Sequence, residues 1–190
     1  MKYFKKLEGE HIYLSPRSIE DIEIFVKWLN DFQTTDYIGR SSQIMTVEAE
    51  KEFLEEYGKK EASFVIIKKE TNQLIGSIAL NDIDYINRTA TLGIFIGDSE
   101  NRNQGYGGEA ILLLLDYAFS YLNLQNIMLW VMEFNQRAVA CYKKCGFREM
   151  GRRRKSRFIN GKYYDQIQMD ILSEEFQGTY IQNKHIGKVE

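Results

Sequence analysis

The sequence comprises 190 residues, with 25 basic and 27 acidic side chains and a formal net charge of −2. This length predicts one domain, large enough to bury a core without a metal or a disulfide. The near-neutral charge provides no overall field that would attract nucleic acid or an anionic membrane. The apolar run from Ala110 to Leu115 is far shorter than the ~18 residues of a membrane-spanning helix. The N-terminus also lacks the continuous apolar region of a secretory signal.

The two cysteines, Cys141 and Cys145, are four residues apart and do not form the C-x-x-C pattern of redox or zinc sites. Together with the lack of a secretory signal, they favour a reducing, cytoplasmic setting. The two histidines, His11 and His185, are far apart in the sequence. We therefore expect no metal site.

The first part of the chain predicts a strand and two helices. A short alternating segment at His11–Leu14 is typical of a strand, and Ser18 opens a helix with Asp21 as its capping-box partner. A second helix is predicted over residues 47–57. The polar stretch between the helices, residues 30–45, is predicted to be a long loop, and loops of this length often carry function.

The middle of the chain predicts an antiparallel meander. Strands are expected at Ser63–Lys68, Leu74–Leu80 and Thr89–Ile96, separated by short polar turns. A polar, glycine-rich segment follows, and residues 109–122 then form a helix that is apolar around most of its circumference. Such a helix packs against a sheet over most of its surface.

The last third predicts a strand at Ile127–Met132, a helix over 136–145 capped by Asn135, and a hairpin at Asn160–Gly161. A strand, glycine loop, helix and strand in succession form a parallel crossover. We therefore predict an α+β fold with a mixed, mostly antiparallel sheet of about seven strands and about four helices. The domain is expected to span residues 1–177. The polar tail, residues 178–190, is expected to be poorly ordered or to pack on a partner.

The segment Arg102-x-x-Gly105-x-Gly107, followed by Gly108, lies between a predicted strand and a predicted helix. Glycines let the backbone approach a ligand, and the helix N-terminus offers free N–H groups, so this segment suits a pyrophosphate. Arg102 would add positive charge. An ordinary glycine-rich turn remains the alternative. The segment is not a Walker A loop, because it lacks Gly-Lys-Ser/Thr.

Several motifs in the right order resemble the GNAT family, the Gcn5-related N-acetyltransferases. They are Ile94-Phe95-Ile96, the Arg102–Gly108 loop, Asn135, and Tyr142-x-x-x-Gly146-Phe147. The resemblance covers about residues 10–173. It is strongest to the branch that contains ribosomal-protein N-terminal acetyltransferases and spermidine acetyltransferases. It implies the GNAT fold and an acetyl-CoA-dependent N-acetyltransferase.

The resemblance also implies roles for individual residues toward acetyl-CoA. The backbone of Ile94, Phe95 and Ile96 would contact the pantetheine arm. The loop formed by Arg102, Asn103, Gln104, Gly105, Tyr106, Gly107 and Gly108 would hold the pyrophosphate. Asn135 would contact the cofactor arm, although its position as a helix cap explains it equally well.

Tyr142 would protonate the departing thiolate of coenzyme A; the alternative is a core tyrosine with a satisfied hydroxyl. The attacking amine must lose a proton, directly or through water. Many relatives place a glutamate two residues before the glycine of the preceding strand, where this chain has Thr91. The candidate bases are therefore Asp82, Asp84, Glu133 or water.

The acceptor is expected to be a primary amine: a protein N-terminus, a polyamine or another small amine. The acidic residues Asp31, Asp36, Glu55 and Glu56 would favour a cationic amine. Six basic residues within 148–157 would allow RNA contact, although a solvated strand face explains them too. The alternative function is therefore a catalytically weak acyl-CoA-binding or RNA-contacting regulatory module. A homodimer is also possible, and no membrane partner is expected.

Overall fold

The computed structural model describes residues 2–57 and 62–181. Within these residues the strands form one eight-stranded sheet in the order β1-β2-β3-β4-β5-β6-β8-β7. The strands are β1 (Leu7–Glu8), β2 (Ile12–Pro16), β3 (Ser63–Lys68), β4 (Gln73–Asp84), β5 (Thr89–Ile96), β6 (Asn126–Met132), β7 (Arg148–Ile159) and β8 (Lys162–Leu172). The helices are α1 (Ile22–Leu29), α2 (Phe32–Ile38), α3 (Val47–Tyr57), α4 (Tyr106–Ser120) and α5 (Gln136–Lys144), with short 3₁₀ turns at Ile19–Asp21, Ser99–Asn101 and Ser173–Glu175.

The sheet is mixed. β5 and β6 pair in parallel through the crossover helix α4, and the other strand pairs of the described chain are antiparallel. This confirms the α+β fold with a central parallel crossover. The structure adds the short strand β1 and the helix α2, neither of which the sequence pattern predicts.

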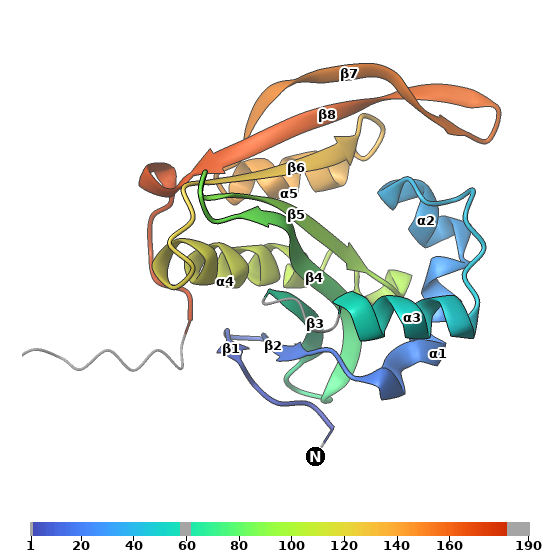
Figure 1. The fold of residues 1–190 in the computed structure, drawn as a ribbon, viewed down its shortest axis with the longest axis horizontal. Helices are drawn as coiled ribbons and strands as arrows, with labels where there is room; N and C mark the ends of the chain where they lie inside the picture. Colours follow the sequence, from blue (N-terminus) through green and yellow to red (C-terminus); the bar gives the residue numbers. More distant parts are fainter. Residues whose placement is uncertain (1, 58–61, 182–190) are drawn as a thin grey trace, which may run out of the picture.

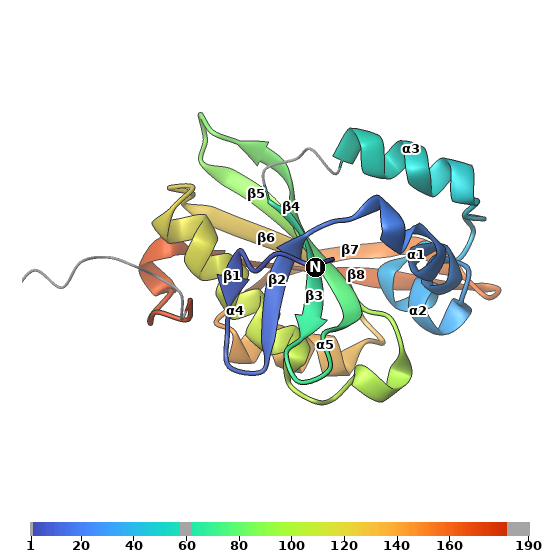
Figure 2. The same ribbon diagram turned by 90° about the horizontal axis from the view of Figure 1, so that it is seen from below.

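Helices cover the sheet on both faces (Figure 1). Alternation along β2 sends Ile12 and Leu14 into the main core cluster, which α4 fills with residues such as Leu113 and Leu114. Tyr13 points to the other face, into a second cluster with Phe25 and Trp28 of α1. α4 and α5 lie together beneath the sheet in Figure 2, while α2 and α3 gather beside α1.

The prediction of a long loop over residues 30–45 is wrong for its first half, which contains the helix α2. Asp31 accepts a hydrogen bond from the Gln33 amide (2.9 Å), and α2 ends at Gly39 with a positive φ of 69°. The helix is short and has no clear apolar period, so its N-cap and C-terminal glycine were the only sequence signals for it.

The expected capping box between Ser18 and Asp21 is also wrong. The Ser18 hydroxyl accepts from the Glu20 amide at 3.3 Å. Asp21 is buried instead, where it accepts a hydrogen bond from the Tyr3 hydroxyl (2.9 Å) and pairs with Lys2 (2.7 Å). The N-terminal segment thus binds the carboxylate that would otherwise complete the capping box.

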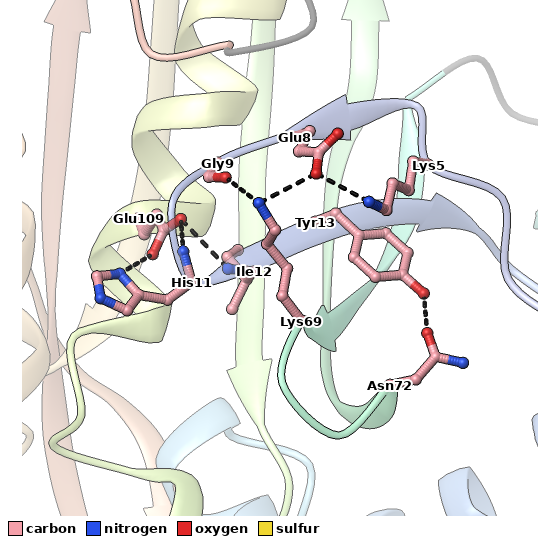
Figure 3. A network of polar contacts seen from close by, with 9 residues as sticks. All are labelled: Lys5, Glu8, Gly9, His11, Ile12, Tyr13, Lys69, Asn72 and Glu109. Carbon is pink, nitrogen blue, oxygen red and sulfur yellow. Dashed lines mark hydrogen bonds and ion pairs between the residues drawn. The ribbon is translucent and has the colours of Figure 1, made fainter.

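The N-terminal turn of α4 is attached to the β1–β2 turn through Glu109 (Figure 3). One carboxylate oxygen accepts from the backbone N–H groups of His11 (2.9 Å) and Ile12 (3.3 Å), and the other lies 3.3 Å from the His11 ring. A Cβ at Gly9 would come within 2.2 Å of this carboxylate. The close contact fixes the start of the helix that follows the glycine-rich loop.

The C-terminal segment folds back onto its own chain. The buried carboxylate of Asp116 in α4 accepts hydrogen bonds from the amides of Tyr180 (2.8 Å) and Ile181 (3.1 Å). Ile181 is 5 % exposed and belongs to the main core cluster. The expectation of a poorly ordered or partner-bound tail is therefore wrong for these two residues. Residues 182–190, His185 among them, lie outside the described residues.

The basic segment 148–157 runs along β7 at one border of the sheet. Arg148 pairs with Glu175 (2.7 Å), and Arg152 pairs with Glu149 (3.0 Å). Most of the segment is exposed, as a solvated strand face requires. No helix among the described residues is long and apolar enough to cross a membrane.

Candidate active site

The site begins where β5 and β6 separate. Their parallel pairing extends only from Thr89–Asn126 to Thr91–Met128. Beyond Thr91, β5 keeps its antiparallel pairing with β4 as far as Ile96, so its other edge faces the gap toward β6. Alternate residues of a strand direct their backbone groups to opposite edges, so part of the Ile94–Ile96 backbone faces this gap, where the Ile96 carbonyl accepts from Arg102 Nε at 3.2 Å.

A cavity of about 650 Å³ occupies this gap. It is bordered by β5, the glycine-rich loop, α5 and the α1–α3 region. Of the residues proposed from the sequence, the cavity is lined by Ile94, Phe95, Ile96, Arg102, Asn103, Gly105, Tyr106, Gly107, Gly108, Asn135 and Tyr142. Residues far apart in the sequence thus meet in one concave site of the size expected for a ligand pocket.

The glycine-rich loop ends in left-handed backbone conformations. Asn103 has a φ of 62°, and Gly105, the N-cap of α4, has a φ of 86°. A Cβ at Gly107 would meet only Ile94 and Ile96 at 4.0 Å, so the cavity side of this residue is open. The first amides of α4 have no partners within the helix and carry its positive dipole end. This geometry fits a pyrophosphate.

Arg102 is held by the protein itself. Its Nη1 donates to the Gln33 carbonyl (3.0 Å), Nη2 donates to the Thr34 hydroxyl (3.0 Å) and the Gly97 carbonyl (2.5 Å), and Nε donates to the Ile96 carbonyl (3.2 Å). The side chain therefore ties the glycine-rich loop to α2. The sequence suggested only that Arg102 adds charge for phosphate, because the partner helix was not predicted.

Asn135 caps α5. Its side-chain oxygen accepts from the Ala138 amide at 3.2 Å, and the residue also borders the cavity. Both roles considered from the sequence are compatible with this position. α5 then presents Cys141 and Tyr142 toward the same cavity.

Tyr142 is 8 % exposed, and its ring packs against Phe147 at a centroid distance of 6.0 Å. Burial raises the pKa of the Tyr142 phenol, and the neighbouring thiols of Cys141 and Cys145 raise it further. The hydroxyl therefore keeps its proton throughout the neutral range. A protonated phenol beside a ligand cavity can act as a general acid.

The three carboxylates considered as bases do not border the cavity. Asp84 accepts from the amides of Ile86 (2.9 Å) and Asn87 (2.8 Å), which lowers its pKa and makes it a turn residue. Glu133 accepts from the Asp165 amide at 2.8 Å. Asp82 is exposed with a positive φ of 52°.

The acids expected to attract a cationic amine also serve elsewhere. Asp31 caps α2, Glu55 faces Lys51 on the surface of α3 at 3.9 Å, and Asp36 accepts from the Ser41 hydroxyl beside a smaller pocket that shares Gln33, Tyr37 and Arg102 with the main cavity. The Glu56 side chain lies outside the described part of the chain. None of the three described acids borders the main cavity.

Sequence reasoning missed five charged residues of the cavity wall: Arg137 and Lys144 of α5, and, on the side of α1–α3, Arg17, Arg40 and Glu50. Arg17 follows β2, Arg40 follows α2, and Glu50 lies in the first turn of α3. None of these three belongs to a motif, and their proximity arises only from the packing of α1 and α3. The single sequence signal for these residues was that Glu50 is an acid in the first turn of a predicted helix. The helix dipole explains an acid at that position without any function.

Comparison with known proteins matches residues 11–148 to the family model of the acetyltransferase (GNAT) domain. A spermidine N(1)-acetyltransferase of Vibrio cholerae is 40 % identical over 116 residues, which cover 61 % of this chain and 66 % of that protein. A prophage-derived uncharacterized N-acetyltransferase of Bacillus subtilis is 32 % identical over 89 % of this chain and 94 % of its own length.

Among solved structures, spermidine N-acetyltransferase from Vibrio cholerae in complex with CoA and spermine superposes with a TM-score of 0.80. The two chains are 30 % identical, and the match covers 87 % of this chain and 97 % of that one. Fold, cavity and family model agree. The chain belongs to the GNAT family and is an acetyl-CoA-dependent N-acetyltransferase.

Proposed function

We propose that the chain transfers an acetyl group directly from acetyl-CoA to a primary amine in the cavity between β5 and β6, with Tyr142 as general acid. The observation that carries the proposal is the meeting of the glycine-rich loop and the buried Tyr142 phenol at one cavity. Acetyl-CoA supplies a thioester acetyl group and a thiolate leaving group. Ile94, Phe95 and Ile96 orient its arm through the free edge of β5, and the first amides of α4 bind its pyrophosphate.

The amine reaches the cavity from the side of α1–α3. An alkylammonium ion has a pKa near 10.4 and must lose a proton before it can attack. Asp82, Asp84 and Glu133 do not line the cavity. We therefore infer that water in the open cleft accepts the proton that the ammonium group loses. Tyr142 then donates its phenolic proton to the departing sulfur and is restored from solvent.

The acceptor class is narrowed by the relatives. The Vibrio cholerae relative is a spermidine N-acetyltransferase, and its solved structure contains CoA and spermine. This similarity supports a small amine as the acceptor of this chain. A protein N-terminus remains the other acceptor to be compared.

The first test combines a thermal melt with an assay of released coenzyme A. Acetyl-CoA at 100 times its Kd is expected to raise the melting temperature by roughly 5–11 °C. The rise is expected to disappear when Gly105 and Gly107 are both replaced by valine, because the new side chains block the loop. Gly151→Val is the matched control, since Gly151 lies in β7 and a Cβ added there would have no neighbour within 4 Å.

Melts without ligand show whether the variants fold, and Gly107→Val alone serves if the positive φ of Gly105 makes the double variant unstable. Acetylation of spermidine or of a peptide N-terminus with release of coenzyme A supports the proposal. A wild-type protein that neither shifts with millimolar acetyl-CoA nor releases coenzyme A with any amine contradicts it.

A further inference from the structure

The acceptor side of the cavity is positively charged. Arg17 and Arg40 both line it, and Glu50 is the one carboxylate among the described lining residues. The remaining basic residues of the lining, Arg102, Arg137 and Lys144, belong to the glycine-rich loop and to α5, on the cofactor side. A site built only for a polycation would need the opposite balance of charge, because like charges repel.

Arg17 is fixed in place by its neighbours. Its guanidinium lies 5.1 Å from the ring centroid of Phe25 and 5.8 Å from that of Phe53, between α1 and α3. Its Nη2 donates to the hydroxyl of Ser77, a buried residue of β4. Stacking on aromatic rings is characteristic of arginine and orients the planar donor fork. The fork is therefore held at the cavity wall before any ligand arrives.

The hydrogen-bonding capacity of Arg17 is not filled within the described structure. Its Nε is buried without a partner, and no carboxylate of the described chain lies within ion-pair distance of its guanidinium. A charge removed from water is costly unless an opposite charge accompanies it. An arginine so placed at the wall of a substrate cavity is suited to an incoming anion.

Glu50 does not form an ion pair with Arg17 in the described structure. The residue is 1 % exposed, and both of its carboxylate oxygens are buried without hydrogen-bond partners. It lines the cavity together with Arg17 and Arg40 and offsets part of their charge, so the three side chains together keep a net positive charge. Burial raises the pKa of Glu50, while the two arginines lower it.

We propose that the acceptor carries a carboxylate close to its reactive amine, and that Arg17 binds this carboxylate. The acceptor class is then an amino acid or a similar amino carboxylate rather than an unmodified polyamine. The guanidinium fork matches a carboxylate geometrically. This inference rests on the proposed acetyl transfer to an amine and specifies its acceptor.

The test uses pairs of amines that differ only in one carboxylate: lysine and cadaverine, ornithine and putrescine, phenylalanine and phenethylamine. Binding of each compound to the full chain saturated with coenzyme A is measured by calorimetry, and acetylation is measured in parallel. A hydrogen-bonded charge pair contributes roughly 1.5–3 kcal/mol, so the carboxylated member of at least one pair is expected to bind about 10- to 100-fold more tightly.

Arg17→Gln is expected to abolish this preference, and Arg17→Lys is expected to restore part of it, since lysine keeps the charge without the fork. Arg153→Gln is the matched control, because it removes an equal charge from the exposed face of β7. The acetyl-CoA melting shift of each variant shows that the fold and the cofactor site are intact.

Equal binding within every pair, tighter binding of the decarboxylated members, or binding of none of the compounds overturns the inference. So does a preference that survives in Arg17→Gln. Acetylation of the diamines without preference would refute the role of Arg17 and leave the proposed acetyl transfer standing. Lack of acetyl-CoA binding would instead refute the proposed function itself.

Discussion

Tyr142 combines two properties: its ring is almost fully buried, and the residue borders the cavity. The first follows from its place on α5, where Val139, Tyr142 and Cys145 turn toward the core. The second follows from the separation of β5 and β6, which leaves room in front of the helix. Burial raises the pKa of the phenol, so the hydroxyl keeps its proton at neutral pH, as the proposed role of general acid requires.

Replacing Tyr142 with phenylalanine is expected to lower kcat by a factor of about 10²–10⁴, which is the usual contribution of general acid–base catalysis. The affinity for acetyl-CoA is expected to stay unchanged, because the ring is retained. Since the pKa of Tyr142 is raised, loss of its proton should not reduce kcat below about pH 10. Steady-state kinetics across pH and calorimetry with acetyl-CoA check these expectations.

Tyr163→Phe is the control for this variant, because Tyr163 is 63 % exposed on β8. An unchanged kcat with weakened acetyl-CoA affinity would show that Tyr142 acts in packing or binding and not as the acid.

At the scale of elements, the glycine-rich loop depends on anchors at both of its ends. Arg102 attaches its start to α2 and to the end of β5. Glu109 attaches its end to the β1–β2 turn, as Figure 3 shows. The loop itself contains glycines and gains little rigidity from its own side chains. Its shape is therefore imposed by neighbouring elements.

Glu109→Ala is expected to destabilise the protein by about 1–2 kcal/mol, because two backbone N–H groups lose their charged acceptor. It is also expected to weaken acetyl-CoA binding, since the first turn of α4 becomes less well fixed. Urea unfolding measures the first effect and calorimetry the second. Glu52→Ala, an exposed position of α3, should change neither quantity. If Glu109→Ala and Glu52→Ala show the same stability and the same affinity for acetyl-CoA, the Glu109 anchor contributes nothing to either.

At the scale of the whole molecule, the two halves of the chain build one cavity, and the C-terminal segment secures the arrangement. The N-terminal half supplies α1–α3 and the acceptor wall, and the second half supplies the loop, α5 and Tyr142. The segment that reaches Ile181 runs back along α4 and bonds to Asp116. A buried carboxylate in an apolar helix is thereby satisfied by chain from the far end of the sequence.

Asp116→Ala is expected to cost about 1.5–3 kcal/mol of unfolding free energy, the usual contribution of hydrogen bonds to a charged group. Hydrogen exchange at the amides of Tyr180 and Ile181 is expected to accelerate, because these amides lose their acceptor. Urea unfolding and exchange mass spectrometry provide the two readouts. Ser120→Ala is the control, since it removes only the hydroxyl that bonds to the other carboxylate oxygen at 3.0 Å. Unchanged exchange at Tyr180 and Ile181 would contradict this attachment.

Much of the fold could be predicted because local signals were strong. The apolar alternation of β3 to β5, the long apolar face of α4, the Asn135 cap and the Asn160–Gly161 turn each determine a local conformation. The short helix α2 escaped prediction because it has no apolar period. The buried place of Asp21 escaped because its partners, Lys2 and Tyr3, are distant in the sequence.

The same division holds for the site. The sequence by itself determined the cofactor side, since the glycine-rich loop, the helix after it and Tyr142 lie in contiguous motifs whose chemistry is local. Only the tertiary structure decided the acceptor side. Arg17, Arg40 and Glu50 come from three separate parts of the chain and meet because α2 and α3 both pack against α1. The sequence determines which side chains are charged, but long-range packing determines which of these charges line the same cavity.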